Sequence, residues 1–137
     1  MSQDNVDIVR RGYELYAAGD LEGVSGMFST DAEVADSGGL GLAGTAAGTL
    51  HGPEGFLRAA NESLEAFDDY HVEAEDYIDT GDAVVVLVRI SGRGRASGAK
   101  METRLAHLWV LGSNGKVIRG EVYRTTAEAL AAVGLPE

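Results

Sequence analysis

The feature that most constrains the fold of this chain is a change in the spacing of its apolar residues about halfway along. Residues 6–18, and the segment that begins at Pro53, carry apolar side chains three or four residues apart, as amphipathic helices do. From residue 71 onward, alternating or β-branched apolar runs are separated by turn sequences. This order predicts an α+β fold, in which helices precede a sheet of hairpin-connected strands.

The first half contains signals for helix ends. Gly19 is placed to end the first helix, and Asp20 to cap a short second helix. That second helix is expected to carry Leu21, Val24 and Phe28 on one face. Residues 32–36 are typical of a short strand, and residues 37–52 form a glycine-rich irregular stretch. Pro53 then begins a third helix, whose apolar stripe comprises Phe56, Ala60, Leu64 and Phe67.

The second half predicts strands at residues 71–79, 83–90, 100–111 and 116–123, and a final helix at 127–133 that Gly134 ends. Turns are expected at 80–82 and 112–115, the latter containing Asn114-Gly115. Such short connections imply an antiparallel sheet with helices on one face. If the sheet is curved, a cavity remains between the layers, and such cavities usually bind small molecules.

Composition excludes several classes of protein. A length of 137 residues suits one domain, 1–137, and the absence of cysteine excludes disulfides and thiolate zinc sites. A net charge of −11 argues against nucleic acid or anionic membranes as partners. With no apolar run long enough to span a membrane and a polar, acidic N-terminus, a cytoplasmic protein is expected. His51, His71 and His107 share no ligand spacing, and residues 38–41 do not form a dinucleotide fingerprint, so neither metal nor cofactor is expected.

Several segments together resemble the ketosteroid isomerase and SnoaL-like superfamily of NTF2-like proteins. They are the opening helix pair at 11–24, the strand segment at 27–36, the start of the third helix at 50–55, and the last hairpin at 107–119. The resemblance covers residues 5–133. It implies a cone-shaped α+β fold, with a curved antiparallel sheet wrapped around helices and an internal pocket for a small hydrophobic ligand. It also implies a homodimer formed through the outer sheet face, where Val84, Val86, Val88 and Ile90 would provide an apolar patch.

The resemblance assigns roles to three positions. Asp36 falls where the isomerases place their catalytic aspartate base. Gly12 falls where they carry a tyrosine, and His107 where they carry a protonated aspartic acid. Those two missing groups are the hydrogen-bond donors of the isomerase oxyanion hole. The base is retained without the donors, which argues against steroid isomerisation itself.

Each candidate residue has a structural alternative. Asp36 is either a base that removes a proton next to a carbonyl, or a turn aspartate bonded to its own backbone. His107 shares an apolar strand face with Leu105, Trp109 and Leu111. It is a core residue, a donor that polarises a substrate oxygen, or a base oriented by Asp36. Arg89 is either directed into the pocket or exposed, and Arg124 raises the same question.

The aromatic residues Tyr16, Trp109 and Phe56 complete the candidate site. Tyr16 is a candidate hydrogen-bond donor to the ligand, whereas Tyr13 is expected to be a core residue with its hydroxyl at the rim. Trp109 and Phe56 are expected to form pocket wall or core. The leading hypothesis is a cofactor-independent acid/base enzyme that acts on a small hydrophobic carbonyl-type compound. The alternative is a non-catalytic ligand-binding or dimerisation domain of the same fold.

Overall fold

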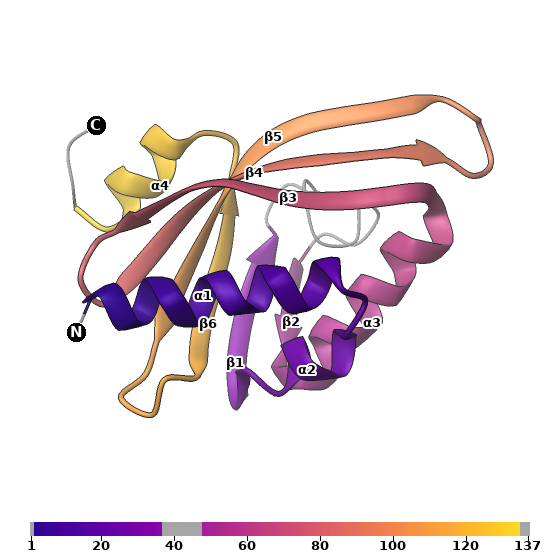
Figure 1. Ribbon diagram of the computed structural model, residues 1–137. Helices are drawn as coiled ribbons and strands as arrows, with labels where there is room; N and C mark the ends of the chain where they lie inside the picture. Colours follow the sequence, from indigo (N-terminus) through magenta and orange to yellow (C-terminus); the bar gives the residue numbers. More distant parts are fainter. Residues whose placement is uncertain (1, 37–47, 135–137) are drawn as a thin grey trace.

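Residues 2–36 and 48–134 are described in the computed structural model of the chain, in which a six-stranded sheet packs against four helices. The helices are α1 (Ser2–Ala17), α2 (Leu21–Ser25), α3 (Gly52–Ala66) and α4 (Thr126–Ala132). The strands are β1 (Phe28–Asp36), β2 (Gly48–His51), β3 (Phe67–Asp79), β4 (Ala83–Gly94), β5 (Lys100–Leu111) and β6 (Val117–Tyr123). This arrangement confirms the expected α+β class (Figure 1).

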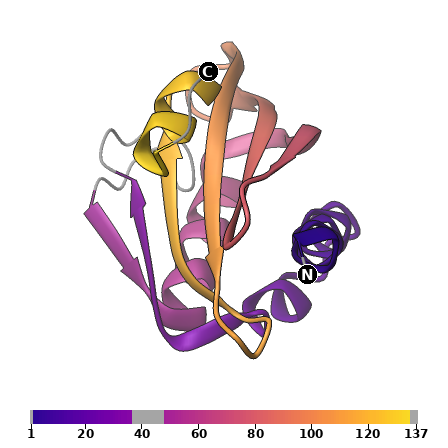
Figure 2. The same ribbon diagram turned by 90° about the vertical axis from the view of Figure 1, so that its left-hand side faces the viewer.

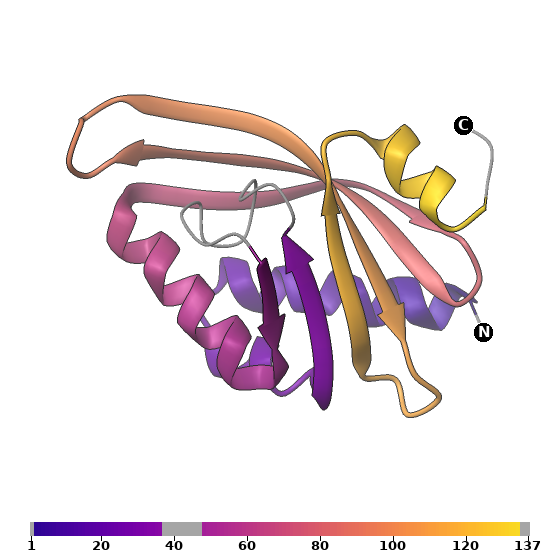
Figure 3. The ribbon, with the colours of Figure 1, turned by 180° about the vertical axis from the view of Figure 1, so that it is seen from behind.

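The strand order is β2-β1-β6-β5-β4-β3. All neighbouring strands are antiparallel except β1 and β6, which run parallel, so the sheet is mixed rather than wholly antiparallel. The sheet is strongly curved, with α1, α2 and α3 on its concave side (Figures 1 and 2). Seen from behind, β1 and β2 pack beside α3 while α1 lies beyond them (Figure 3).

Two apolar cores lie on opposite faces of the sheet. The larger one joins the concave face to α1, α2 and α3, and contains Val9, Phe28, Val34 and Trp109. The smaller one lies under α4 on the convex face, where Ala129 packs with Val85 and Leu108. The helices are therefore not confined to one face as predicted, because α4 covers the convex side (Figure 2).

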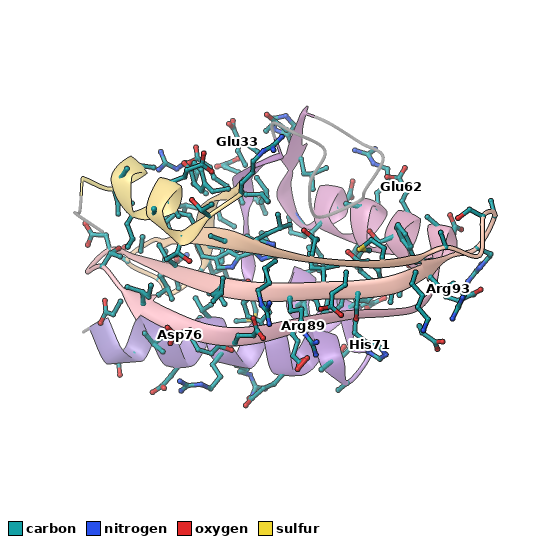
Figure 4. All side chains as sticks on the ribbon, turned by 90° about the horizontal axis from the view of Figure 1, so that it is seen from above. Glu33, Glu62, His71, Asp76, Arg89 and Arg93 are labelled. Atoms are coloured by element: carbon teal, nitrogen blue, oxygen red, sulfur yellow. The ribbon has the colours of Figure 1, made fainter. Side chains whose placement is uncertain are left out.

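Because helices cover both faces of the sheet, the predicted orientation of β4 has to be corrected. Val84, Val86, Val88 and Ile90 belong to the concave core and do not form an outer apolar patch for dimerisation. The alternate positions of β4 face outward, so Arg89 lies on the convex side, where it pairs with Glu73 and Glu102 (Figure 4). Because Val85 is also buried, beneath α4, the run 83–86 is apolar on both faces and its sequence pattern does not mark the inner one.

The helix ends follow the sequence signals more closely than the strand starts do. Gly19 has a φ of 83° after α1, Asp20 accepts a hydrogen bond from the Gly23 amide, and Pro53 stands in the first turn of α3. Phe28, expected on the second helix, instead begins β1. Strand β2 lies within the segment expected to be irregular, and β3 begins at Phe67 rather than at residue 71. Among the described residues, no helix is long and apolar enough to cross a membrane.

Candidate functional site

An apolar cavity of about 80 Å³ lies between the concave face of the sheet and the first three helices. Helix α1 provides much of one wall, and β5 provides the opposite wall with His107 and Trp109. The lining residues are Ile8, Val9, Gly12, Tyr13, Tyr16, Val24, Met27, Phe28, Phe56, Ala60, Tyr70, Val72, Ile90, His107, Trp109 and Val117. None of these described residues carries a permanent charge, so the cavity suits a neutral guest.

Three aromatic side chains at the wall form a hydrogen-bonded chain. The Trp109 Nε1–H donates to the Tyr13 hydroxyl oxygen at 2.8 Å. The same hydroxyl lies 2.8 Å from Nδ1 of His107. The His107 side chain is deeply buried, with 3% of the residue exposed. A tyrosine at the end of α1 therefore fixes two residues of β5, which explains why the hydroxyl of Tyr13 is internal rather than at the rim.

The proton positions in this chain follow from the chemistry of its members. Indole can only donate, so the Tyr13 oxygen accepts from Trp109 and retains its own proton for another acceptor. Burial raises the pKa of Tyr13, so the phenol stays neutral at ordinary pH. We assign the Tyr13 hydroxyl as the donor to Nδ1 of His107, which lies 2.8 Å away, and a neutral imidazole that accepts at Nδ1 carries its proton on Nε2. This assignment gives His107 its Nε2–H tautomer.

Two glycines make room for this arrangement. Gly120 pairs with Trp109 across β5 and β6, and a Cβ at Gly120 would stand 2.5 Å from Cζ3 of the indole. The missing side chain lets the indole lie flat on β6. Gly12 lines the cavity, and a Cβ there would meet the Met27 sulfur at 3.4 Å. At the position where the resemblance implies a tyrosine, Gly12 thus leaves room for Met27, and Tyr13, one residue further along α1, supplies a phenol.

The structure sorts the predicted site residues into three groups. Tyr16, Phe56, His107 and Trp109 line the cavity. Arg89 lies on the convex face, where its Nη2 is 2.8 Å from Glu73, and this corrects the expectation that it enters the pocket. Arg124 is exposed between β6 and α4, where its backbone amide donates to Glu128, and it does not line the cavity either.

Asp36 is described through its backbone alone, and its side chain lies outside the described part of the chain. It is the last residue of β1 and pairs with Gly48. Its neighbour Ala35 pairs with Glu121 of β6, and the next residue of β6, Val122, pairs with His107. Asp36 and His107 therefore stand at the same level of the sheet, two strands apart, or about 10 Å between backbones.

Sequence reasoning missed three residues of this site. The sequence places Tyr13 in the core, next to Gly12 at the family position, and no local pattern reveals that its hydroxyl meets β5. Gly120 and Met27 carried no signal, because their roles depend on contacts between distant segments. Within residues 2–36 and 48–134, no group of three or more histidine and carboxylate side chains gathers in a way that would hold a metal ion.

Comparisons with known proteins identify the family. Residues 9–120 match the SnoaL-like domain family, and the chain belongs to it. No curated protein sequence matches the chain. Solved structures with the ketosteroid isomerase-like and NTF2-like fold match it over nearly its whole length, which confirms the predicted fold.

Three of these structures indicate the range of the fold. An NTF2-like protein from Burkholderia thailandensis is 26% identical, with a TM-score of 0.78 over 96% of this chain and 98% of the other. TerC, crystallised with polyporic acid, is 23% identical, with a TM-score of 0.73 and 96% of both chains covered. A putative polyketide cyclase from Sinorhizobium meliloti is 24% identical, with a TM-score of 0.68 over 89% of this chain and 98% of the other.

Proposed function

We propose that this protein is a cofactor-independent acid/base enzyme that acts on a small, neutral, hydrophobic carbonyl-type compound. The observation that carries the proposal is the hydrogen-bonded chain from Trp109 through Tyr13 to His107, set in the wall of an otherwise apolar cavity. A buried polar chain of this kind fixes one imidazole tautomer and orients its ring. Such an imidazole is suited to donate a hydrogen bond to a carbonyl oxygen.

In the proposed reaction, Asp36 is the base. Its carboxylate removes a proton from the carbon next to the carbonyl, the C–H electron pair forms a carbon–carbon double bond, and the carbonyl π pair moves to the oxygen. The Nε2–H of His107 stabilises the resulting enolate oxygen. The level that Asp36 and His107 share in the sheet supports this assignment, because a small ligand spans about 10 Å together with two side chains.

The apolar surroundings assist both steps. A carboxylate next to apolar walls is less well solvated than one in water, which raises its basicity toward a carbon acid. A hydrogen bond to a developing oxyanion is also stronger where water is excluded. The substrate class follows from the cavity: charge on the ligand would have no described partner there, whereas one carbonyl oxygen would have His107.

The test is exchange of the protons next to the carbonyl of 2-butanone in D₂O, followed by ¹H NMR. This assay detects proton abstraction without knowledge of the natural product. Wild-type protein is expected to accelerate exchange, and Asp36→Asn to lower the catalysed rate about 100-fold or more. Asp31→Asn, which changes an exposed aspartate of the same strand, is the matched control and should exchange like wild type. Unchanged exchange in Asp36→Asn would remove Asp36 from the mechanism.

A second variant asks whether the reaction occurs in the cavity. Gly12→Leu places its first side-chain carbon at ordinary contact distance from Met27 and directs further atoms into the hollow. It should abolish exchange while the circular dichroism spectrum remains that of wild type. Persistence of exchange in a folded Gly12→Leu protein would locate the reaction elsewhere.

A non-catalytic ligand-binding domain is the second candidate. It is favoured by the absence of any carboxylate from the described residues that line the cavity. Under this alternative, ketones bind and Gly12→Leu blocks them, but no exchange is catalysed by any form of the protein.

Homodimerisation also remains a proposal, to be tested by light scattering, and it would need a surface other than the buried valine face of β4.

A further inference from the structure

A groove of about 290 Å³ lies next to the cavity, at the C-terminal end of α1. It is bordered by α1, the start of α2, the end of α3 and the first part of β3. Figure 1 shows this end of α1 beneath β3 and beside α3. Three residues line both the groove and the cavity: Tyr16, Tyr70 and Val72. The two hollows therefore share part of their walls.

The cavity alone is small. Its volume of about 80 Å³ is roughly half that of an engineered cavity of about 150 Å³ that holds one benzene molecule. A ligand with more than a few carbon atoms therefore has to extend beyond the cavity while its polar end stays beside His107. The groove is the adjoining space, and its volume is more than three times larger.

The groove is lined for an apolar occupant. Leu64 is 39% exposed there, one of only two large apolar residues so exposed in the part of the chain that the structure describes. Leu21 and Ala17 add further apolar surface, and His71 stands among the lining residues on β3. Water against Leu64 and Leu21 is unfavourable, and an alkyl chain would displace it.

Tyr16 and Tyr70 stand at the boundary between the two hollows. Both residues line the cavity as well as the groove, and burial raises the pKa of the Tyr16 hydroxyl. Tyr70 also stacks on Phe67, with ring centroids 5.5 Å apart, which ties it to the start of β3. Two aromatic rings at this boundary offer flat apolar surface against which an alkyl chain can pack.

We propose that the groove is a second subsite that binds the unbranched apolar tail of the ligand whose carbonyl lies in the cavity. This inference rests on the proposed function for the position of the carbonyl. It adds a substrate class: medium-chain alkyl carbonyl compounds, with the carbonyl beside His107, the chain passing between Tyr16 and Tyr70, and the tail against Leu64 and Leu21.

The experiment measures the affinity of a series of methyl ketones from 2-butanone to 2-decanone by isothermal titration calorimetry on the full-length protein. Each methylene buried in the groove should tighten Kd about fourfold, since burial of one methylene contributes about 0.8 kcal/mol. The quantity compared between proteins is the ratio of the Kd of 2-butanone to that of 2-octanone, because it cancels any general change in the cavity.

Two variants change a residue of the groove, and a third, the control, changes an exposed apolar residue outside it. Leu64→Asp introduces a charge and Ala17→Trp fills space, and each should lower the ratio at least tenfold relative to wild type. Ile118→Asp makes the same kind of change at the other exposed apolar residue, which is 44% exposed on β6, and should leave the ratio unchanged. Two groove variants of different chemistry guard against one of them failing to fold.

The outcomes separate the two proposals. Loss of the chain-length effect in Leu64→Asp and Ala17→Trp, but not in Ile118→Asp, would support the subsite. If 2-butanone binds but affinity does not rise with chain length, or if the groove variants match wild type, the subsite is overturned while the proposed function survives. If no ketone of any length binds, the proposed function fails and this extension fails with it.

Discussion

Replacement of Tyr13 by phenylalanine tests whether its hydroxyl holds the site together. The variant keeps the ring and its edge-on contact with Tyr77, but removes the acceptor of Trp109 and the donor to His107. A buried donor left without its acceptor costs about 1–3 kcal/mol. Nδ1 of His107 also loses its donor, so we expect a destabilisation of about 2 kcal/mol at pH 7. For a chain of this size that corresponds to a Tm lower by about 6–10 °C.

The same variant makes a second prediction at high pH. The pKa of Tyr13 is raised in the folded state by burial, while an unfolded tyrosine ionises near pH 10. A raised pKa stabilises the fold fully below the unfolded value, and this contribution is lost as the pH rises above it. Wild type should therefore lose up to about 1.4 kcal/mol per pH unit through Tyr13 above pH 10, and Tyr13→Phe loses none through this residue. The stability gap of about 2 kcal/mol should thus close by about pH 11.5.

Urea unfolding at pH 7, 9, 10.5 and 11.5, followed by far-ultraviolet circular dichroism, measures both effects. Tyr77→Phe is the control at pH 7: the Tyr77 ring packs against Tyr13 and under Arg10, contacts that a phenylalanine ring can keep, so the change should cost under about 0.5 kcal/mol. If Tyr13→Phe is as stable as wild type at pH 7, the hydrogen-bonded chain does not stabilise the fold. If the gap is the same at pH 9 and 11.5, the hydroxyl of Tyr13 is not protected from ionisation.

Two further substitutions test other parts of the account. Gly120→Ala should destabilise the protein by about 1–3 kcal/mol and shift its tryptophan fluorescence, because a Cβ 2.5 Å from Cζ3 forces Trp109 to move. A variant with the stability and emission of wild type would contradict this packing. Arg89→Ala should change the urea midpoint of unfolding little and leave the Kd of 2-butanone within twofold, because Arg89 forms partly exposed ion pairs on the convex face. A tenfold weaker Kd would show instead that the guanidinium contacts the ligand.

Most helices and strands can be predicted from the sequence because their signals are local. Gly19 ends α1 with a positive φ, Asp20 caps α2 through its own side chain, and Asn114-Gly115 turns the last hairpin, each within a few residues. The spacing of His107 and Trp109 in β5 also predicts that they share a face, because alternate residues of a strand point to the same side of the sheet. These features need no knowledge of the rest of the fold.

The errors arise where the outcome depends on distant segments. β4 is buried on both faces near its start because α4, some forty residues later in the chain, covers Val85. The sequence therefore does not distinguish the even from the odd positions of β4. For this reason Arg89 is predicted to face the pocket, whereas it lies on the convex face. Phe28 fits the helical spacing of α2 equally well, but its ring stacks on Phe56 of α3 with centroids 5.1 Å apart, and it begins β1 instead. The hydroxyl of Tyr13 finds His107 across the cavity for the same non-local reason.

The most direct test of the central claim is a crystal structure of the protein with 2-octanone. The account predicts ketone density inside the cavity, with its oxygen within hydrogen-bonding distance of His107, Tyr13 still bonded to Nδ1, and the carboxylate of Asp36 facing the carbon next to the carbonyl. Density for the ketone outside the cavity, or an Asp36 side chain directed away from a ketone bound at His107, would contradict it.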